Sequence, residues 1–324
     1  MQTIILHVKL TQPQRSSKSL IIINLKMSDA LRSETIAFSL GAQTSEGLVN
    51  IPQLVPNITL SGRQSKVIVA DYAFGKSRIL YSTASIFFAG QIGQRDVVFL
   101  YGDSDQEHET SLALSAVGTK TTNSNISFTN KDNTTTVTFL AGIKGLVTVF
   151  ESDTQLVLYS DGDTAGTFFA PLIPSSDSGD RGTFKNYWQI GSNTTVLVGG
   201  PYLVRNASIT GSTLELRGDL NATVILTVIA PPQVREVTWN GQVVDTMQHA
   251  KSSAILEGQI RPKSSLSGIA IPKLSDWRYA DSLPEIKRSF SDNGWTVANH
   301  TTTNIPFKPY HGDGRVLYGC DYEL

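Results

Sequence analysis

The chain has 324 residues, with 27 Lys and Arg against 28 Asp and Glu, so its formal net charge is −1 at pH 7. Charge that is this sparse and balanced gives no support for a nucleic-acid partner, an anionic membrane surface or a polyanionic substrate. The length predicts two or three domains, and no apolar run approaches the ~20 residues that cross a bilayer.

The first residues give little evidence for export. The apolar run at residues 4–6 is interrupted by His7 and Lys9, and the run at residues 20–23 is too short for the core of a signal peptide. Residues 1–28 are therefore left unassigned to a domain. They are interpreted as a leader foreign to the fold, with a real strand and linker as the alternative.

From residue 30 onward the chain is a series of short strands separated by turns. Segments of strand length that alternate or run apolar lie at residues 35–40, 66–71, 78–82, 96–101, 111–115, 135–140, 146–151, 154–159, 194–198, 214–217, 223–229 and 236–239. Asn240-Gly241 predicts a tight hairpin, because both residues tolerate positive φ. This spacing predicts an all-β fold of consecutive antiparallel β-sandwich domains, without alternating strands and helices.

One acidic turn invites a catalytic or metal interpretation. Asp103, Asp105, Glu107 and Glu109 lie close together in the sequence around His108. Their spacing matches no standard zinc site, and too few ligands converge for calcium. A solvated turn whose last residues enter the next strand is the favoured interpretation.

Two other patterns also have a structural and a functional interpretation. Asp161-Gly162-Asp163 resembles a fragment of a calcium loop but lacks its remaining ligands, so a hairpin turn is favoured. Aromatic side chains that could stack on a sugar are Tyr187, Trp188, Trp239, Trp277 and Trp295. For Trp188 and Trp239 the apolar neighbours favour burial in a core. No catalytic, cofactor-binding or metal-binding residue is predicted, and no cofactor is expected.

Asparagine usage points toward the secretory pathway. The N-glycosylation acceptor pattern occurs at Asn57, Asn125, Asn133, Asn193, Asn206, Asn221 and Asn299. Single matches arise by chance in a Ser/Thr-rich chain, but their spread along the sequence favours a secreted glycoprotein.

Three groups of motifs carry a resemblance to a known family. The first comprises Ile51-Pro52-Gln53-Leu54, Leu60-Ser61-Gly62-Arg63, Ser65-Lys66, Asp71-Tyr72 and Tyr81-Ser82-Thr83-Ala84. The second comprises Phe168-Phe169-Ala170-Pro171-Leu172, Asn186-Tyr187-Trp188 and residues 200–207. The third comprises Asp276-Trp277, residues 282–286, Asp292, Trp295, residues 299–303, Leu317-Tyr318 and Asp321-Tyr322. In their order and spacing, these motifs resemble the second domain, the third domain and the start of the fourth in large fungal beta-galactosidases, glycoside hydrolase family 35.

The resemblance implies a division of the chain. Residues 29–200 would form the large antiparallel β domain 2, and residues 201–274 the immunoglobulin-like Greek-key domain 3. Residues 275–324 would begin a truncated jelly-roll domain 4. Three departures stand out: Gln64 replaces an Asp, Val55-Pro56 replaces a Gly-Gly pair, and Glu323-Leu324 replaces a Gly-aromatic pair.

The resemblance also implies a role. In the family two catalytic glutamates lie on an upstream barrel, so no residue of this chain maps to them. The chain is then a non-catalytic scaffold portion, inactive alone, of a secreted enzyme that hydrolyses terminal β-D-galactosyl residues in carbohydrate metabolism. Its partners would be the barrel and the jelly-roll domains of the full-length enzyme. The alternative is a stand-alone carbohydrate-binding or adhesion module.

Cys320 is the only cysteine. No basic neighbour in the sequence activates it, so a reactive thiol is disfavoured. Part of the family carries a cysteine here and another soon after it, and the resemblance therefore implies half of a disulfide. A passively buried cysteine is the alternative.

Overall fold

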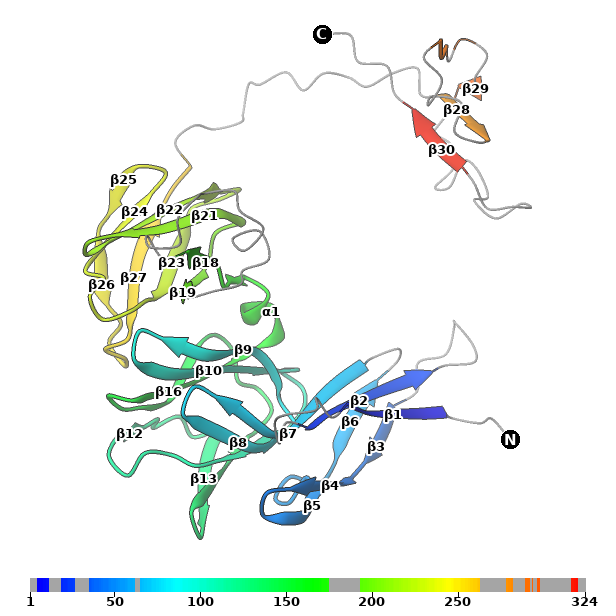
Figure 1. Cartoon of the computed structure of the whole chain (residues 1–324), viewed down its shortest axis with the longest axis vertical. Helices are drawn as coiled ribbons and strands as arrows, with labels where there is room; N and C mark the ends of the chain where they lie inside the picture. The colour runs from blue at the N-terminus through cyan, green and yellow to red at the C-terminus, as the bar shows by residue number, and fades with distance from the viewer. Residues whose placement is uncertain are drawn as a thin grey trace. The chain divides into compact units, whose positions relative to one another are not determined.

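The computed structural model describes residues 5–11, 19–26, 35–61, 65–174, 193–262, 278–281, 289–291, 293, 296–297 and 316–319. The chain divides into two compact units, Met1–Lys263 and Ser264–Leu324. Regular structure in the described ranges is nearly all strand, mostly in antiparallel pairs (Figure 1). The predicted all-β fold of several β domains is confirmed. Within these ranges no helix has the length and hydropathy that a bilayer crossing requires.

Two sheets form the first sandwich. Sheet 1 has the order β1 (Ile5–Thr11), β2 (Ser19–Lys26), β7 (Ser65–Phe74), β8 (Ser77–Ser82), β11 (His108–Leu112), β14 (Thr134–Phe139) and β13 (Ile126–Lys131). Sheet 2 has the order β12 (Thr119–Lys120), β15 (Val147–Glu151), β16 (Gln155–Asp161), β10 (Arg95–Gly102) and β9 (Ser85–Ile92). The central strands β10 and β16 of sheet 2 are parallel.

Two more sheets form the second sandwich. Sheet 3 has the order β17 (Phe168–Phe169), β20 (Leu197–Gly199), β23 (Val224–Ile229), β27 (Ile255–Ile260) and β26 (Thr246–Gln248). Sheet 4 has the order β21 (Leu203–Thr210), β22 (Thr213–Asp219), β24 (Glu236–Trp239) and β25 (Gln242–Val244). The short helix α1 (Gly162–Ala165) follows β16 and precedes β17.

Smaller pairs complete the described structure. Two-stranded pairs are β3 (Thr35–Phe38) with β6 (Ile58–Ser61), β4 (Leu40–Thr44) with β5 (Gly47–Ile51), and β18 (Leu172–Pro174) with β19 (Asn193–Thr195). The second unit contains a three-stranded sheet of β29 (Thr296–Val297), β28 (Arg278–Asp281) and β30 (Val316–Gly319).

Sheet 2 is buried on both faces. Along β10, Val98 and Leu100 pack into the core shared with sheet 1, whereas Val97 and Phe99 pack into a core shared with sheet 3. The side chains of β16 alternate in the same way. Val157 and Tyr159 pack into the core shared with sheet 1, and Leu156 and Leu158 pack into the core shared with sheet 3. Side chains of a strand point alternately to opposite faces, so a strand covered on both sides needs an unbroken apolar run. The apolar runs in these two strands are therefore explained by layers above and below them.

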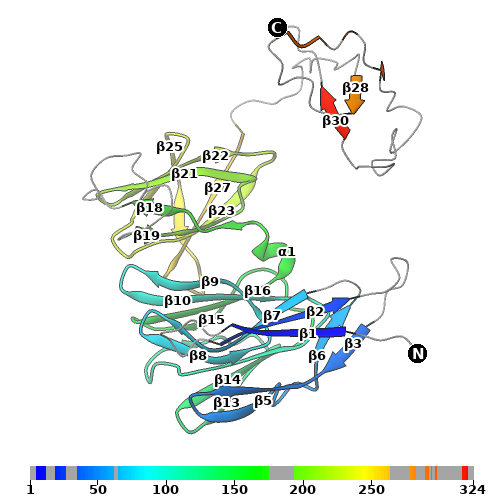
Figure 2. The same ribbon diagram turned by 45° about the vertical axis from the view of Figure 1, so that its right-hand side comes forward.

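The core between sheets 2 and 3 joins the two sandwiches. Leu197, Ile229 and Ile255 of sheet 3 contribute to it, and so does Phe168 of the edge strand β17 of the same sheet. Phe168 packs edge-on against Phe99, with 5.0 Å between the ring centroids. A Cβ on Gly199 would lie 2.5 Å from the Phe168 ring, so glycine is needed for this close approach. Figures 1 and 2 show the strands of sheet 2 between those of the other layers.

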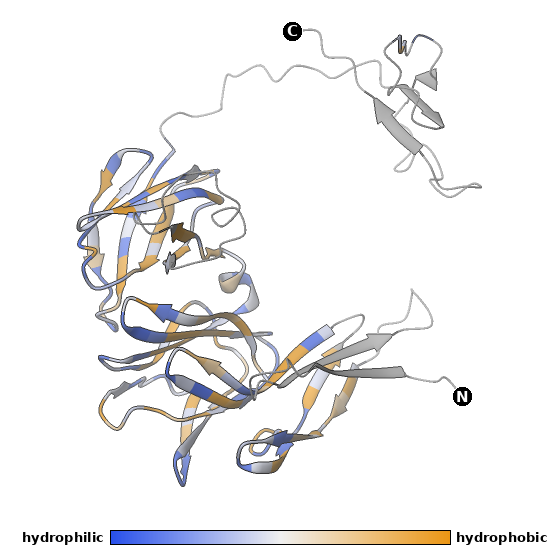
Figure 3. Ribbon diagram, in the orientation of Figure 1, coloured by the Kyte–Doolittle hydropathy of each residue, from blue (hydrophilic) through white to orange (hydrophobic). Residues whose placement is uncertain are grey.

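The layering continues on either side of this joint. Sheet 3 packs against sheet 4 around residues such as Leu226, Leu216 and Trp239. Sheet 1 uses its second face as well, because Ile68 and Tyr81 pack against the two small pairs β3–β6 and β4–β5. Apolar residues recur along the strands of both sandwiches (Figure 3). The first unit is thus a stack of sheets in which each layer buries the face of its neighbour.

The sequence located many of these strands, and its hairpin signal is confirmed. Asn240 and Gly241 join β24 to β25 with φ of 50° and 77°, the positive values that a tight two-residue turn requires.

Leu158 and Leu48 offer a matched pair for testing the buried joint. Leu158 is 0% exposed in the core between sheets 2 and 3, whereas Leu48 is 73% exposed. We expect Leu158→Ala to lower the free energy of unfolding by about 3 kcal/mol, because it removes apolar contacts and leaves a cavity. Leu48→Ala should change it by less than about 0.5 kcal/mol. Urea denaturation of the two variants measures this difference, and equal effects would contradict the described packing.

Candidate functional site

The acidic turn between β10 and β11 is the strongest titratable cluster predicted from the sequence. Asp105 and Glu107 are exposed, but His108 and Glu109 are 1% and 0% exposed. His108 and Glu109 enter β11, as predicted for the last residues of the turn, but both are buried rather than solvated. The side chain of Glu109 points inward from β11, because the strand is buried along its whole length.

Glu109 anchors a distant loop. Its carboxylate accepts hydrogen bonds from the backbone N–H groups of Leu54 (2.7 Å), Val55 (2.8 Å) and Gln53, and from the Tyr81 hydroxyl (2.7 Å). Burial, together with the hydrogen bond to Glu109, raises the pKa of Tyr81. A buried carboxylate is tolerated when it is this fully hydrogen-bonded. Because its oxygens are engaged and hidden, Glu109 holds the backbone and cannot reach a substrate.

His108 is buried beside other polar groups. Burial, and then the charge of Lys66, lower its pKa from 6.5 to about 4. A Cβ on Gly102 would lie 2.3 Å from His108 Nε2 and 2.7 Å from the Tyr159 hydroxyl, so glycine at 102 leaves room for both rings. The imidazole is therefore a neutral core group at physiological pH.

Among the described residues, no group of three or more His, Cys, Asp or Glu side chains is placed to hold a metal ion. In the acidic turn, for example, Asp105 and Glu107 are exposed to solvent, whereas His108 and Glu109 are buried.

The prediction of a hairpin turn at Asp161-Gly162-Asp163 is wrong. Asp161 instead caps the N-terminus of α1 by accepting from Thr164 N (2.9 Å) and Thr164 Oγ1 (2.7 Å). It also accepts from the backbone N–H of Gly145 at 2.7 Å. Burial acts to raise the pKa of Asp161, but the hydrogen bonds from Thr164 and Gly145 outweigh it and the pKa is lowered. A capping carboxylate satisfies backbone donors that the helix leaves free, and here it also ties a second loop to the helix.

The aromatic residues divide between core and undescribed segments. Trp239 is 5% exposed and belongs to the core between sheets 3 and 4, which confirms its predicted burial. Tyr187, Trp188, Trp277 and Trp295 lie outside the described residues.

The predicted modification sites stay predictions. Asn57, Asn133, Asn206 and Asn221 are exposed, and Asn125 is partly exposed. The side chain of Asn193 is not described, and Asn299 and Cys320 lie outside the described residues.

An ion pair that the sequence did not reveal lies at the joint of the sandwiches. Arg95 Nη1 is 3.5 Å from Glu151 Oε1, and Ser253 Oγ donates to the same oxygen from the second sandwich. The three residues are far apart in the sequence and belong to no motif, so no local signal could have grouped them.

Comparison with known proteins identifies both sandwiches. Residues 4–168 match the family model of beta-galactosidase, domain 2, and residues 169–255 match that of beta-galactosidase, domain 3. The first match begins at residue 4, and β1 and β2 are strands of sheet 1. The interpretation of residues 1–28 as a leader foreign to the fold is therefore wrong, and its alternative, a real strand, fits this segment. The two matches meet between residues 168 and 169, whereas the sequence placed this boundary between 200 and 201.

Fungal proteins resemble most of the chain. A probable beta-galactosidase C of Aspergillus niger is 35% identical over 309 residues, which cover 91% of this chain and 28% of that protein. A probable beta-galactosidase C of Talaromyces marneffei is 36% identical over 298 residues, covering 91% and 28%. A probable beta-galactosidase B of Neosartorya fischeri is 35% identical over 295 residues, covering 88% and 27%. The chain thus spans less than a third of the length of these relatives.

Glu109 and Glu107 provide a test of the anchor. We expect Glu109→Gln to lower the free energy of unfolding by about 3 kcal/mol, because the amide nitrogen cannot accept from the donors that the carboxylate serves. The same change at exposed Glu107 should alter it by less than about 0.5 kcal/mol. Thermal or urea denaturation measures both. Equal small effects would show that Glu109 does not hold the 53–55 loop.

His108 makes stability depend on pH. Between pH 6.5 and about 4 the unfolded chain binds a proton at His108 that the folded chain does not bind. Falling pH therefore favours unfolding in this window, by about 3 kcal/mol in total from this group. We expect His108→Gln to flatten the pH dependence of the unfolding free energy between these values. An unchanged slope in the variant would contradict the buried neutral imidazole.

Proposed function

Since the chain belongs to the beta-galactosidase domain 2 family, whose model its residues 4–168 match, we propose that it is supporting architecture of a beta-galactosidase rather than its catalytic part. The observation that carries this proposal is coverage. About nine tenths of the chain aligns with probable fungal beta-galactosidases, yet it accounts for 28% of their length. The hydrolysis of terminal β-galactosyl residues then belongs to a catalytic barrel encoded elsewhere in such a protein.

The roles of the buried acidic groups support this proposal. Retaining glycosidases need two carboxyl groups ~5–5.5 Å apart on either side of the scissile bond, one of them able to protonate the leaving group. The carboxylates of Glu109 and Asp161 instead accept hydrogen bonds from backbone N–H groups. Asp96 is similar, since it accepts from Lys76 N (2.9 Å), Ser77 Oγ and Gln91 Nε2. Carboxylates used in this way stiffen turns and loops.

The stack of sheets also supports a scaffold role. A unit in which sheet 2 is packed on both faces presents its outer surfaces at fixed separations, as a support for other domains requires. We propose as partners the catalytic barrel and the jelly-roll domains of the full-length enzyme. We further propose that the parent protein is secreted and glycosylated, on the evidence of the spread of acceptor asparagines. The start of a further domain at residue 275 is likewise a proposal.

Activity assays on the purified chain test the proposal directly. We expect no turnover of a nitrophenyl β-galactoside above buffer, because the acidic groups described above serve the fold. A parallel glycan array should show no saturable, galactose-competed binding. Turnover by the chain alone would overturn the proposal, and binding on the array would favour a stand-alone carbohydrate-binding module instead.

A complementation experiment tests whether the chain supports a catalytic segment. The catalytic segment of the Aspergillus niger relative, produced without the region that matches this chain, is mixed with the chain. We expect the chain to raise the thermal midpoint or the activity of that segment. Albumin at equal concentration is the control, and no difference between the two additions would count against a scaffold role.

A further inference from the structure

The turn between β24 and β25 combines two residues that can react with each other. Asn240 and Gly241 form this turn with φ of 50° and 77°, and both are exposed to solvent. In an Asn-Gly pair the backbone nitrogen of the glycine can attack the side-chain Cγ of the asparagine, because glycine has no side chain to obstruct the approach. The bond from Cγ to Nδ2 breaks, ammonia leaves and a succinimide ring forms, which water then opens to aspartate or isoaspartate.

The side-chain amide of Asn240 is paired with the backbone of a neighbouring strand. Its Nδ2 donates to Gly218 O at 2.9 Å, and its Oδ1 accepts from Gly218 N at 3.0 Å. The backbone N–H of Asn240 donates to Leu216 O at 2.8 Å. The parallel pairing of β22 with β24 ends at Leu216 and Trp239. The amide therefore continues the ladder in place of the backbone, which turns away at Gly241.

Gly218 is a closely packed partner for this amide. A Cβ at residue 218 would lie 2.0 Å from Leu203 O and 2.7 Å from the Trp239 ring, so the residue fits tightly between β21 and Trp239. Attack by Gly241 N requires the Asn240 amide to rotate toward its own backbone, and both hydrogen bonds to Gly218 oppose this rotation. We propose that Asn240-Gly241 is a latent deamidation site, which the pairing with Gly218 protects in the folded chain.

The site opens by local motion of the turn. The strand β25 has three residues and lies at the edge of sheet 4, and its Gln242 and Val243 are exposed. Opening at such an edge costs less free energy than global unfolding. Deamidation then prevents the pairing from forming again. Aspartate lacks the Nδ2 donor and places a carboxylate oxygen near the Gly218 carbonyl, and isoaspartate adds a carbon atom to the main chain of the turn.

Deamidation rates in the folded and the unfolded chain test the proposal. The full chain is kept in mildly alkaline buffer with and without guanidinium chloride, and peptide mass spectrometry follows aspartate and isoaspartate at Asn240. In the unfolded chain we expect a rate close to that of Asn293, since Asn293-Gly294 is the other Asn-Gly pair of the sequence. In the folded chain we expect Asn240 to react at least about tenfold more slowly. Equal rates in the two conditions would overturn the proposal, as would no reaction at Asn240 in the unfolded chain.

Gly218→Ala and Gly211→Ala compare the protecting contact with the same change beyond the other end of β22. The Cβ at residue 218 displaces the partner of Asn240. A Cβ at residue 211 meets no atom within 4 Å, and with φ of 61° it strains the backbone without touching the pair. We expect Gly218→Ala to raise the folded-state rate at Asn240 toward that of the unfolded chain, and Gly211→Ala to leave it unchanged. Equal rates in the two variants would show that Gly218 does not protect the site.

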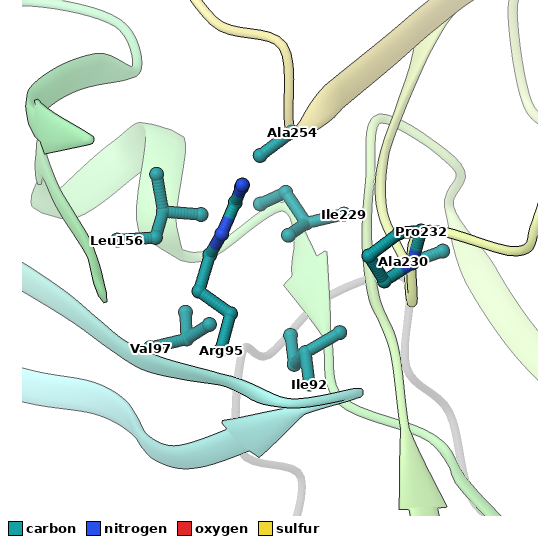
Figure 4. Close-up of a pocket in the computed structure, with 8 residues that line it drawn as sticks. All are labelled: Ile92, Arg95, Val97, Leu156, Ile229, Ala230, Pro232 and Ala254. Atoms are coloured by element: carbon teal, nitrogen blue, oxygen red, sulfur yellow. The ribbon is translucent and has the colours of Figure 1, made fainter. Parts of the chain in front are cut away.

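Leu156→Ala separates local from global opening. Leu156 lines a small crevice at the joint between the sandwiches, together with Ile229 and Ala254 (Figure 4). Its truncation weakens the packing of the joint and leaves the turn at Asn240 unaltered. We expect the folded-state rate at Asn240 to stay the same. An increase in proportion to the lost stability would show that Asn240 reacts only after global unfolding, and would overturn the proposal.

Discussion

Burial of both faces of sheet 2 is the constraint on which the rest of the first unit depends. Phe99 and Leu158 lie on the face opposite to Val98 and Val157, and each set needs its own apolar cover. Without sheet 3, the outer set would form an exposed apolar patch of the kind that drives aggregation. The second sandwich is therefore part of the core of the first, and the boundary between the two family matches is not a boundary between independent folding units.

Buried polar groups serve this architecture at the places where apolar packing cannot. Glu109 holds the loop at residues 53–55, Asp161 joins the start of α1 to Gly145, and Glu151 links Arg95 to Ser253. In each case the polar group satisfies donors that come from another segment of the chain. If one partner were removed, a buried donor or charge would be left without a hydrogen bond in an apolar environment. Only the arrangement that pairs these groups avoids this cost, so they specify a single structure. This use of carboxylates is the structural basis for proposing a scaffold.

The sequence predicted the fold class, many of the strands and the turn at Asn240-Gly241, because these follow from local periodicity and turn chemistry. The family was also accessible, since its motifs are short and keep their order. The burial of Glu109 was not predictable, because its partners Gln53, Leu54 and Val55 lie 54 to 56 residues earlier in the chain. The cap at Asp161 was missed for a different reason, since Asp-Gly-Asp suits a turn as well as a helix start. Whether an acidic residue faces solvent or backbone depends on tertiary packing, which local patterns do not report.

Native-state hydrogen exchange of the full chain tests most directly whether the two sandwiches form one supporting body. The described packing predicts that backbone amides in β16 and β23 share one opening free energy and one dependence on low urea concentrations, because neither sheet can open without exposing the core between them. Loss of protection in β23 at a distinctly lower free energy, with β16 still protected, would contradict the account. It would show two independent domains joined by a weak contact.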